Sequence, residues 1–471
     1  MKKTVFVFLL LFITQITSAQ QTDNQKVTKE NSVVTLESFL QQVATTHPLV
    51  KQAQLLSDMG KQEIRLARGL FDPKFMSDFE MKDFKDKLYY QNWTNQLKIP
   101  TWVGVDIKAG YDRNRGDFLN PESKLPDAGL EYLGVTVPVG QGLFIDQRRA
   151  ALREAQYAKE ILEAERIKLI NKTILQITKD YLEWYASYRQ YEIALKGYEL
   201  AKVRFEGIVD RVLQGDAAGI DSVEAKITFQ DREISLQKAN LELQNSRLLI
   251  SNHLWAENGE PQELSPEHQP AMPILSKRQS VEELVTYAKE NHPELLKLKF
   301  KTSQLEVQRR LAIEMLKPVI DVNYNFLGLS GRTGSLDYMF ANNYKWGFHV
   351  AFPLFFRKER AKLQQTKIKL SQINFENNFA NRQIINDINM FSNELNTYTK
   401  LLQQQDAVLK NQELLVKGEV EKFQNGESSL FLVNSRESKM LEIESKLVDT
   451  QAKFVKSYAS LLWAAGKTIG E

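Results

Sequence analysis

The sequence predicts a mainly helical protein with a membrane β portion, arranged as two tandem repeats. Three observations predict this class. A long stretch in each half of the chain has apolar residues at heptad spacing. A short segment of alternating polar and apolar residues precedes each long stretch. The two halves also show the same features in the same order.

The stretch 144–213 is predicted to form one helix, about 100 Å long at roughly 1.5 Å per residue. Its apolar residues recur in steps of four and three, which is typical of a helix packed along its length against a partner. This stripe consists of Ile170, Ile174, Ile177, Tyr181, Trp184, Tyr188, Tyr191, Leu195 and Tyr198. A second stripe consists of Leu175, Leu182, Tyr185, Ile193, Leu200 and Val203. Two stripes favour a helix between two neighbours in the wall of a tube, whereas one arm of a two-helix coiled coil needs only one.

The N-terminus resembles a secretory signal peptide, predicted to span residues 1–19. Lys2 and Lys3 precede an apolar run at 5–13, and small residues lead to Ala19. Removing these two lysines from the 62 basic residues leaves 60 against 59 acidic ones, so the charge gives no reason to expect a nucleic-acid partner. The chain has no cysteine, which excludes disulfides and thiolate metal sites.

A tandem repeat is visible at two constant offsets. Residues 36–73 match residues 281–318, which places His47-Pro48 on His292-Pro293. Gly215 matches Gly426, and at the same offset four heptad positions coincide: Phe229, Leu236, Leu243 and Ile250 fall on Met440, Leu447, Phe454 and Leu461. We therefore predict a first repeat at 20–259, a linker at 260–275 and a second repeat at 276–471.

Each repeat is expected to contain two short helices, two strands, a long helix and a return helix. Proline disfavours helix in the residue before it, so each His-Pro pair should end the first short helix. The expected ranges are 36–45, a helix to 70, strands from Pro73 to 139, and helices 144–213 and 220–255. The second set is 281–290, a helix to 316, strands from Pro318 to 354, and helices 355–423 and 430–463. Within 82–130 the strand register stays open, although 101–108 alternates as a strand would.

Nothing after the signal offers 18 consecutive apolar residues, so any membrane crossing is expected to use strands. Aromatic residues near the strand ends are typical of an interfacial belt, although β-propensity and core packing also explain them. They are Trp93, Trp102, Tyr324, Tyr344 and Trp346. Four strands per chain cannot close a barrel, whose smallest size is about eight strands, so at least two copies must share one.

The motifs resemble those of the TolC family of outer-membrane efflux proteins over residues 35–466. The carrying features are Leu36 with His47-Pro48, Phe71-Asp72-Pro73, Val137-Pro138-Val139, and the run from Lys422 to Arg436. The resemblance implies a homotrimer in outer-membrane lipid. Its 12-stranded β-barrel continues into an α-barrel tunnel of long antiparallel helices in the periplasm. It further implies the passive exit duct of a tripartite efflux or type I secretion system. The partners would be a periplasmic adaptor (membrane fusion) protein and an inner-membrane transporter of RND or ABC type.

The resemblance assigns the two turns after the long helices as adaptor-docking tips. The matching residues are Val212, Leu213, Gln214, Gly215, Asp216, Phe423, Gln424, Asn425, Gly426 and Glu427. A glycine there lets a partner backbone approach closely, or it serves only as a helix C-cap. The family closes its tunnel near this tip, and Glu413, Glu419 and Glu421 are the candidate gate residues. Solvated glutamates on a long helix are the alternative interpretation.

The sequence gives no sign of an enzyme. Its five histidines form no metal-binding or catalytic motif, and no phosphate-binding loop occurs, so we expect no catalytic residue, cofactor or metal. A different class stays open: a non-conducting periplasmic or surface coiled-coil scaffold or adhesin. It explains the heptads but not the repeated strand–strand–helix order.

Overall fold

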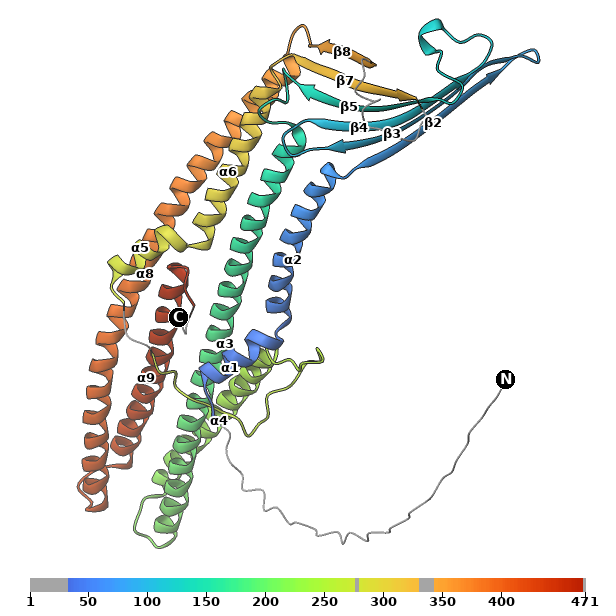
Figure 1. Ribbon diagram of the computed structural model, residues 1–471. Coiled ribbons are helices and arrows are strands. Elements are labelled where there is room, and N and C mark those ends of the chain that lie inside the picture. The colour runs from blue at the N-terminus through green and yellow to red at the C-terminus, as the bar shows by residue number, and fades with distance from the viewer. Residues whose placement is uncertain (1–32, 276–278, 330–342, 469–471) are drawn as a thin grey trace, which may run out of the picture.

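A computed structural model describes residues 33–275, 279–329 and 343–468. The predicted signal peptide lies outside these residues. A layer of long helices carries a sheet at one end and two helical hairpin tips at the other (Figure 1). Among the described residues, no helix is both long enough and apolar enough to cross a bilayer.

The helices come in the same order in both halves of the chain, but among the described residues the first half contributes two more strands to the sheet. The first half contains α1 (Leu36–Thr46), α2 (Pro48–Arg68), η1 (Gly69–Phe71), β2 (Lys74–Asp83), β3 (Leu88–Pro100), β4 (Asp106–Arg115), η2 (Pro121–Ser123), β5 (Leu130–Pro138), α3 (Gln147–Leu213) and α4 (Gly219–Ser251). The second contains α5 (Val281–Asn291), α6 (Pro293–Glu314), β7 (Val319–Leu329), β8 (Tyr344–Ala351), α8 (Arg357–Gln424) and α9 (Leu430–Ala464). The predicted helices agree with these bounds to within a few residues. The repeat boundaries themselves stay a prediction.

Each His-Pro pair separates two helices, as predicted. His47 ends α1 and begins α2, and its Nδ1 accepts a hydrogen bond from the Leu49 N–H at 3.2 Å. His292 does the same between α5 and α6, where its Nδ1 accepts from the Glu294 N–H at 3.2 Å. One imidazole thus satisfies an N–H that the helix start would otherwise leave unpaired.

Helix α3 lies between two pairs of helices. Near the sheet the layer runs α8, α6, α3, α2, and near the tips it runs α8, α9, α3, α4. Ile177, Tyr181 and Trp184 of the first predicted stripe are fully buried. Leu182 of the second stripe is also buried, whereas Val203 near its end is exposed. The prediction that this helix packs on two sides is therefore confirmed.

The predicted linker is held against α3. Its β6 (Gln269–Pro270) pairs in parallel with β1 (Val33–Val34) near the start of the described chain. The buried Tyr181 hydroxyl lies 2.7 Å from the carbonyl oxygens of both Val34 and Ala271. A single side chain therefore fixes two segments that are far apart in sequence.

The sheet has six strands in the described residues, in the order β2-β3-β4-β5-β7-β8, with all neighbours antiparallel. The prediction of four strands per chain is therefore wrong. The extra pair is β3 and β4, and both strands fall within the segment whose register the sequence left open. The alternation at 101–108 does not form one strand either. Gly104 has φ +89° and turns the chain between β3 and β4.

We predict that the protein loses stability between pH 6.5 and 4. Burial, followed by the charge of His253, lowers the pKa of His47 to about 4, and burial lowers the pKa of His292 to about 4. The unfolded chain therefore binds more protons than the folded chain in this window. Its unfolding free energy should fall as the pH falls, by on the order of 2–3 kcal/mol per histidine.

Thermal melts of the detergent-extracted protein at pH 7 and pH 5 test this. His292→Asn keeps an N-cap acceptor but cannot protonate, so it should flatten the pH dependence. His349→Asn, on the exposed β8, is the matched control and should leave it intact. An unchanged pH profile in His292→Asn would contradict the prediction.

Candidate functional site

The sheet has one apolar face and one polar face that run across all six strands. Side chains alternate along each strand, and near the helical end the register places apolar residues opposite apolar ones. Toward the far end the apolar face also carries Gln91, Arg113, Arg115 and Glu131. The apolar face carries Phe75, Phe79, Met81, Trp93, Leu97, Ile99, Ile107, Ala109, Leu133, Val135, Val137, Ile320, Val322, Tyr324, Phe326, Tyr344, Trp346, Phe348 and Val350. The polar face carries Lys74, Asp78, Glu80, Asn92, Thr94, Gln96, Lys98, Lys108, Thr136, Asp321, Asn323, Asn325, Lys345 and His349.

Three side chains with polar atoms on the apolar face form hydrogen bonds to one another. The Ser77 hydroxyl donates to Asn95 Oδ1 at 2.7 Å and accepts from the Trp93 indole N–H at 3.1 Å. A polar atom facing hydrocarbon costs several kcal/mol if it has no partner. This cluster is therefore compatible with a lipid-facing surface.

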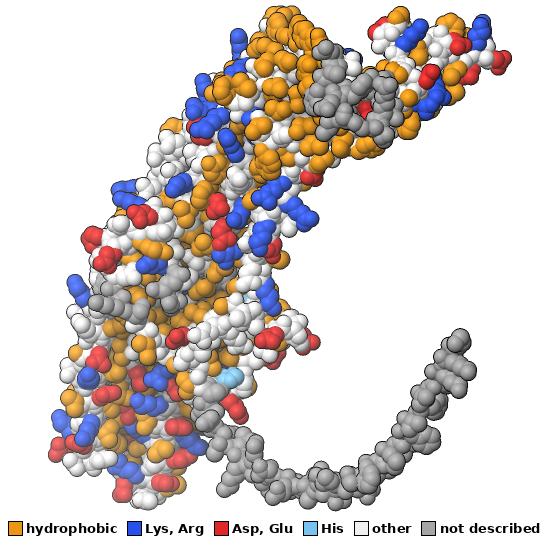
Figure 2. Space-filling view, in the orientation of Figure 1, with side chains coloured by type: hydrophobic (Ala, Val, Ile, Leu, Met, Phe, Trp, Pro, Cys, Tyr) orange, Lys and Arg blue, Asp and Glu red, His pale blue; other side chains and the backbone are white. Residues whose placement is uncertain are grey.

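The polar face is linked by hydrogen bonds across strands. The Thr136 hydroxyl donates to Asn323 Oδ1 at 2.6 Å, and Gln96 Nε2 donates to the Tyr132 hydroxyl at 2.9 Å. A sheet with these two faces can face lipid on one side and water on the other. In Figure 2, apolar side chains gather over the sheet end and charged side chains over the helical tips.

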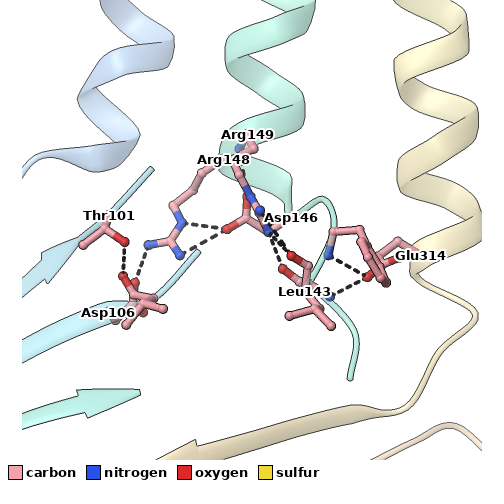
Figure 3. Close-up of polar contacts among 10 residues, drawn as sticks. Thr101, Asp106, Leu143, Asp146, Arg148, Arg149 and Glu314 are labelled. Carbon is pink, nitrogen blue, oxygen red and sulfur yellow. Dashed lines mark hydrogen bonds and ion pairs between the residues drawn. The ribbon is translucent and has the colours of Figure 1, made fainter. Parts of the chain in front are cut away.

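The start of α3 joins the helices to the sheet (Figure 3). Asp146 caps α3 by accepting the Arg149 N–H at 2.8 Å. Arg148 bridges to the sheet, with its guanidinium 2.7 Å from Asp106 and 3.2 Å from Asp146. Burial alone would raise the pKa of Asp146, but hydrogen bonds from Arg149 and the charges of Arg149 and Arg148 lower it below its ordinary value.

A second anchor holds the turn that follows β5. Glu314, buried at the end of α6, accepts hydrogen bonds from the N–H groups of Gly142 at 3.2 Å and Phe144 at 3.4 Å. Lys317 lies 2.7 Å from the same carboxylate. These two connections between the sheet and the helices thus pass through charged side chains near the entry to α3 (Figure 3).

The two predicted tips have the same backbone structure. Gly215 has φ +81° and Gly426 has φ +76°, and a Cβ at either position would meet no atom within 4 Å. The N–H of Asp216 donates to the Arg211 carbonyl, and the N–H of Glu427 donates to the Lys422 carbonyl, both at 2.9 Å. This is a Schellman ending with glycine in the left-handed position. The glycines therefore end both helices directly after their C-caps, Gln214 and Asn425, and the space beside each glycine is sterically open.

The tips pack against each other. Ile208, Ala225 and Leu430 are buried in one cluster, with Val212 and Phe423 partly buried beside them. The structure thus brings together one predicted residue from each tip. The other predicted tip residues are exposed at the two turns.

A charged pair that the sequence did not reveal ties the two hairpins together behind the tips. Arg204 of α3 forms an ion pair with Glu437 of α9, and its guanidinium lies 3.3 Å from Asn434 Oδ1. Both charged side chains are largely shielded from solvent. No sequence signal identifies this pair, because its members are far apart and neither belongs to a motif.

The three candidate gate residues have different surroundings. Glu419 accepts a hydrogen bond from the Ser428 hydroxyl and lies 3.9 Å from the Arg436 guanidinium. It therefore has partners within its own hairpin. Glu413 and Glu421 are exposed.

Two helices carry apolar stripes that are exposed in the part of the chain that the structure describes. On α4 the stripe repeats every seven residues and comprises Ile220, Ile227, Ile234, Leu241 and Leu248, each at least 50% exposed. On α8 it comprises Ile368, Phe375, Phe379, Leu401, Val408 and Leu415. The stripe on α4 has a regular spacing that is visible in the sequence, although it was not among the predicted features.

The chain matches no family model and no curated protein sequence. Its structure is similar to solved outer-membrane channels. The channel CmeC of Campylobacter jejuni matches with a TM-score of 0.64 at 12% identity, over 94% of this chain and 87% of that chain. The open-state channel MtrE of Neisseria gonorrhoeae matches with a TM-score of 0.65 at 12% identity, over 92% and 89%. The outer membrane protein VceC of Vibrio cholerae matches with a TM-score of 0.62 at 14% identity, over 92% and 96%.

The chain has the fold of these outer-membrane channels. The expected resemblance to the TolC family is thereby confirmed at the level of the fold. Within the described part of this channel-like chain, no group of three or more His, Asp or Glu side chains is placed to hold a metal.

We predict that Arg204→Met loosens the tips of this channel-like chain. The substitution keeps an apolar stem but leaves the Glu437 carboxylate without its cation, at a cost on the order of 3 kcal/mol. Hydrogen exchange of the tip amides should accelerate. Lys446→Met breaks the exposed pair between Lys446 and Glu442 and is the control, with an expected change below about 0.5 kcal/mol. Equal protection in wild type and Arg204→Met would contradict the prediction.

Proposed function

We propose that three copies of this chain form a passive exit duct in the outer membrane. The sheets would form the part in lipid and the helices a tunnel in the periplasm. The observation that carries the proposal is the six-stranded sheet with one apolar and one polar face, mounted on a helical layer with uncovered lateral edges. The likeness to solved outer-membrane channels supports it.

The uncovered stripes favour a closed ring. Helix α8 forms one lateral edge of the layer, and α2 with α4 form the other (Figure 1). On α2, Leu55, Met59 and Leu66 are exposed. Helix α2 lies near the sheet and α4 near the tips, so together they form an edge as long as α8 (Figure 1). A contact between unlike edges closes into a ring when the rotation permits. The resemblance to the TolC family supplies the number three.

We propose that the tips dock a periplasmic adaptor protein. Gly215 and Gly426 leave the turns sterically open, and Leu213 and Phe431 expose apolar surface beside them. The adaptor would connect the duct to an inner-membrane transporter of RND or ABC type, which would supply the energy. The exported substrate would be selected mainly by that transporter.

The alternative is a coiled-coil scaffold or adhesin that does not conduct. The two-faced sheet favours the duct, because a scaffold has no need of an apolar sheet surface uncovered by helices. Extraction separates the two. High salt should release a scaffold from the membrane fraction, whereas a duct should stay until detergent is added.

The deciding experiment measures oligomer and current together. The detergent-extracted protein should sediment as a trimer and give stepwise ion current in planar lipid. Ile234→Asp places a carboxylate in the α4 stripe and should abolish the trimer and the current, because the charge would be buried between chains. Asn240→Asp adds the same group to α4 outside the stripe and should change neither. A monomer without current in the wild type would refute the proposed function.

We propose that Glu413 and Glu421 contribute carboxylate rings near the tunnel end. Such rings attract cations. Glu421→Lys should therefore lower cation preference, measured as a shifted reversal potential in a salt gradient. Asp406→Lys makes the same charge change further up α8 and should leave the reversal potential near its wild-type value. An unshifted reversal potential in both Glu421→Lys and Glu413→Lys would remove the gate proposal.

A further inference from the structure

We propose that the trimer closes a barrel of 18 strands, with β2 of each chain paired to β8 of the next. This rests on the proposed function, which supplies the three copies. Each copy contributes the six strands of its sheet. The expected barrel of twelve strands would have to leave two strands per chain outside the ring.

The extra strands β3 and β4 are fully integrated into the sheet. They pair with each other over ten consecutive residue pairs, from Gln91 with Arg115 to Pro100 with Asp106. β3 pairs with β2 over a similar length, and β4 pairs with β5. The sheet therefore has no break at which a hairpin would separate from the rest.

The turn between β3 and β4 is fixed to the helical layer. Asp106, the first residue of β4, is buried and bridges to Arg148 at 2.7 Å (Figure 3). It also lies 2.9 Å from the Lys98 ammonium. In the same turn, Trp102 stacks on Phe71 with ring centroids 4.5 Å apart. These contacts hold the extra strands in line with the start of α3, at the level where the barrel would meet the tunnel.

The width of six strands matches the width of the helical layer. Six strands about 4.8 Å apart and tilted by about 40° cover roughly 38 Å of a barrel wall. Four helices packed about 8–10 Å apart cover roughly 32–40 Å of a tunnel wall. Four strands would cover only roughly 25 Å by the same estimate. The sheet of this chain therefore spans the same arc as its own helices.

The two edge strands are complementary. β2 leads away from the helices and β8 returns toward them, so their pairing between chains is antiparallel like every other pair in the sheet. If Lys74 pairs with Ala351 at the helical end, the apolar faces of the two strands coincide. Glu80 then lies opposite Lys345 on the polar face, and opposite charges directly across a strand pair stabilise it.

Ring closure through β4 is the competing arrangement. It would leave β2 and β3 outside the barrel, although β2 begins at Lys74, directly after η1 at the end of α2. Helix α2 forms the lateral edge of the helical layer. The strand that follows it, β2, is therefore placed to meet the neighbouring chain. If β4 instead paired with β8 of the next chain, Asp112 would take the place of Glu80 opposite Lys345.

Cysteine cross-linking tests this in a chain that has no cysteine of its own. The pair Glu80→Cys with Lys345→Cys should oxidise to a covalent trimer that is visible on a denaturing gel without reductant. Asp78→Cys or Lys82→Cys, each combined with Lys345→Cys, tests a shifted β2–β8 register in which the apolar faces of the two strands still coincide. The pair Asp112→Cys with Lys345→Cys is the matched control and should give no link between chains.

The outcomes test the number of strands in the barrel separately from the proposed function as a duct. A trimer linked through Asp112, or a trimer that links through none of the three β2 positions, would overturn the 18-stranded ring and leave the duct standing. A protein that sediments as a monomer would instead refute the proposed function. Electron cryomicroscopy of the extracted trimer gives an independent count, with 18 strands expected and 12 overturning the proposal.

Discussion

Burial of α3 along two sides determines where the neighbouring helices lie. One side carries Tyr181 and Trp184 and packs toward α1 and α4, and another carries Ile193 and packs toward α9. A helix with one buried face would need only one partner and would form an isolated hairpin. With two buried faces, the two halves of the chain join into one continuous layer, which presents the sheet at one end and both tips at the other.

The helices could be predicted from the sequence because their limits have local causes. The long helix begins after Asp146, whose carboxylate caps it, and ends before Gly215, which adopts a positive φ. The strands could not be predicted as well. Lys85 and Asp86 form the β2–β3 turn with positive φ although neither is glycine, and the alternation at 101–108 concealed the β3–β4 turn.

The candidate site was predictable where it depends on local backbone and unpredictable where it depends on distant pairs. The tip glycines follow from their place after a heptad helix. The ion pair of Arg204 with Glu437 depends on how two hairpins settle against each other, and sequence periodicity carries no such information. The uncovered stripe on α4 is an intermediate case. Its spacing is visible in the sequence, but only the structure distinguishes it from the inward stripe at Leu243 and Ile250.

The short parallel pairing of β1 with β6 has a consequence for the order in which the chain matures. Synthesis delivers Val33 and Val34 early, yet their partners at Gln269 and Pro270 follow only after α3 and α4. Forming a contact across so long a loop is slow. The pairing of β1 with β6 therefore cannot form until more than half of the polypeptide has been made, and in the folded chain the Tyr181 hydroxyl contacts both segments.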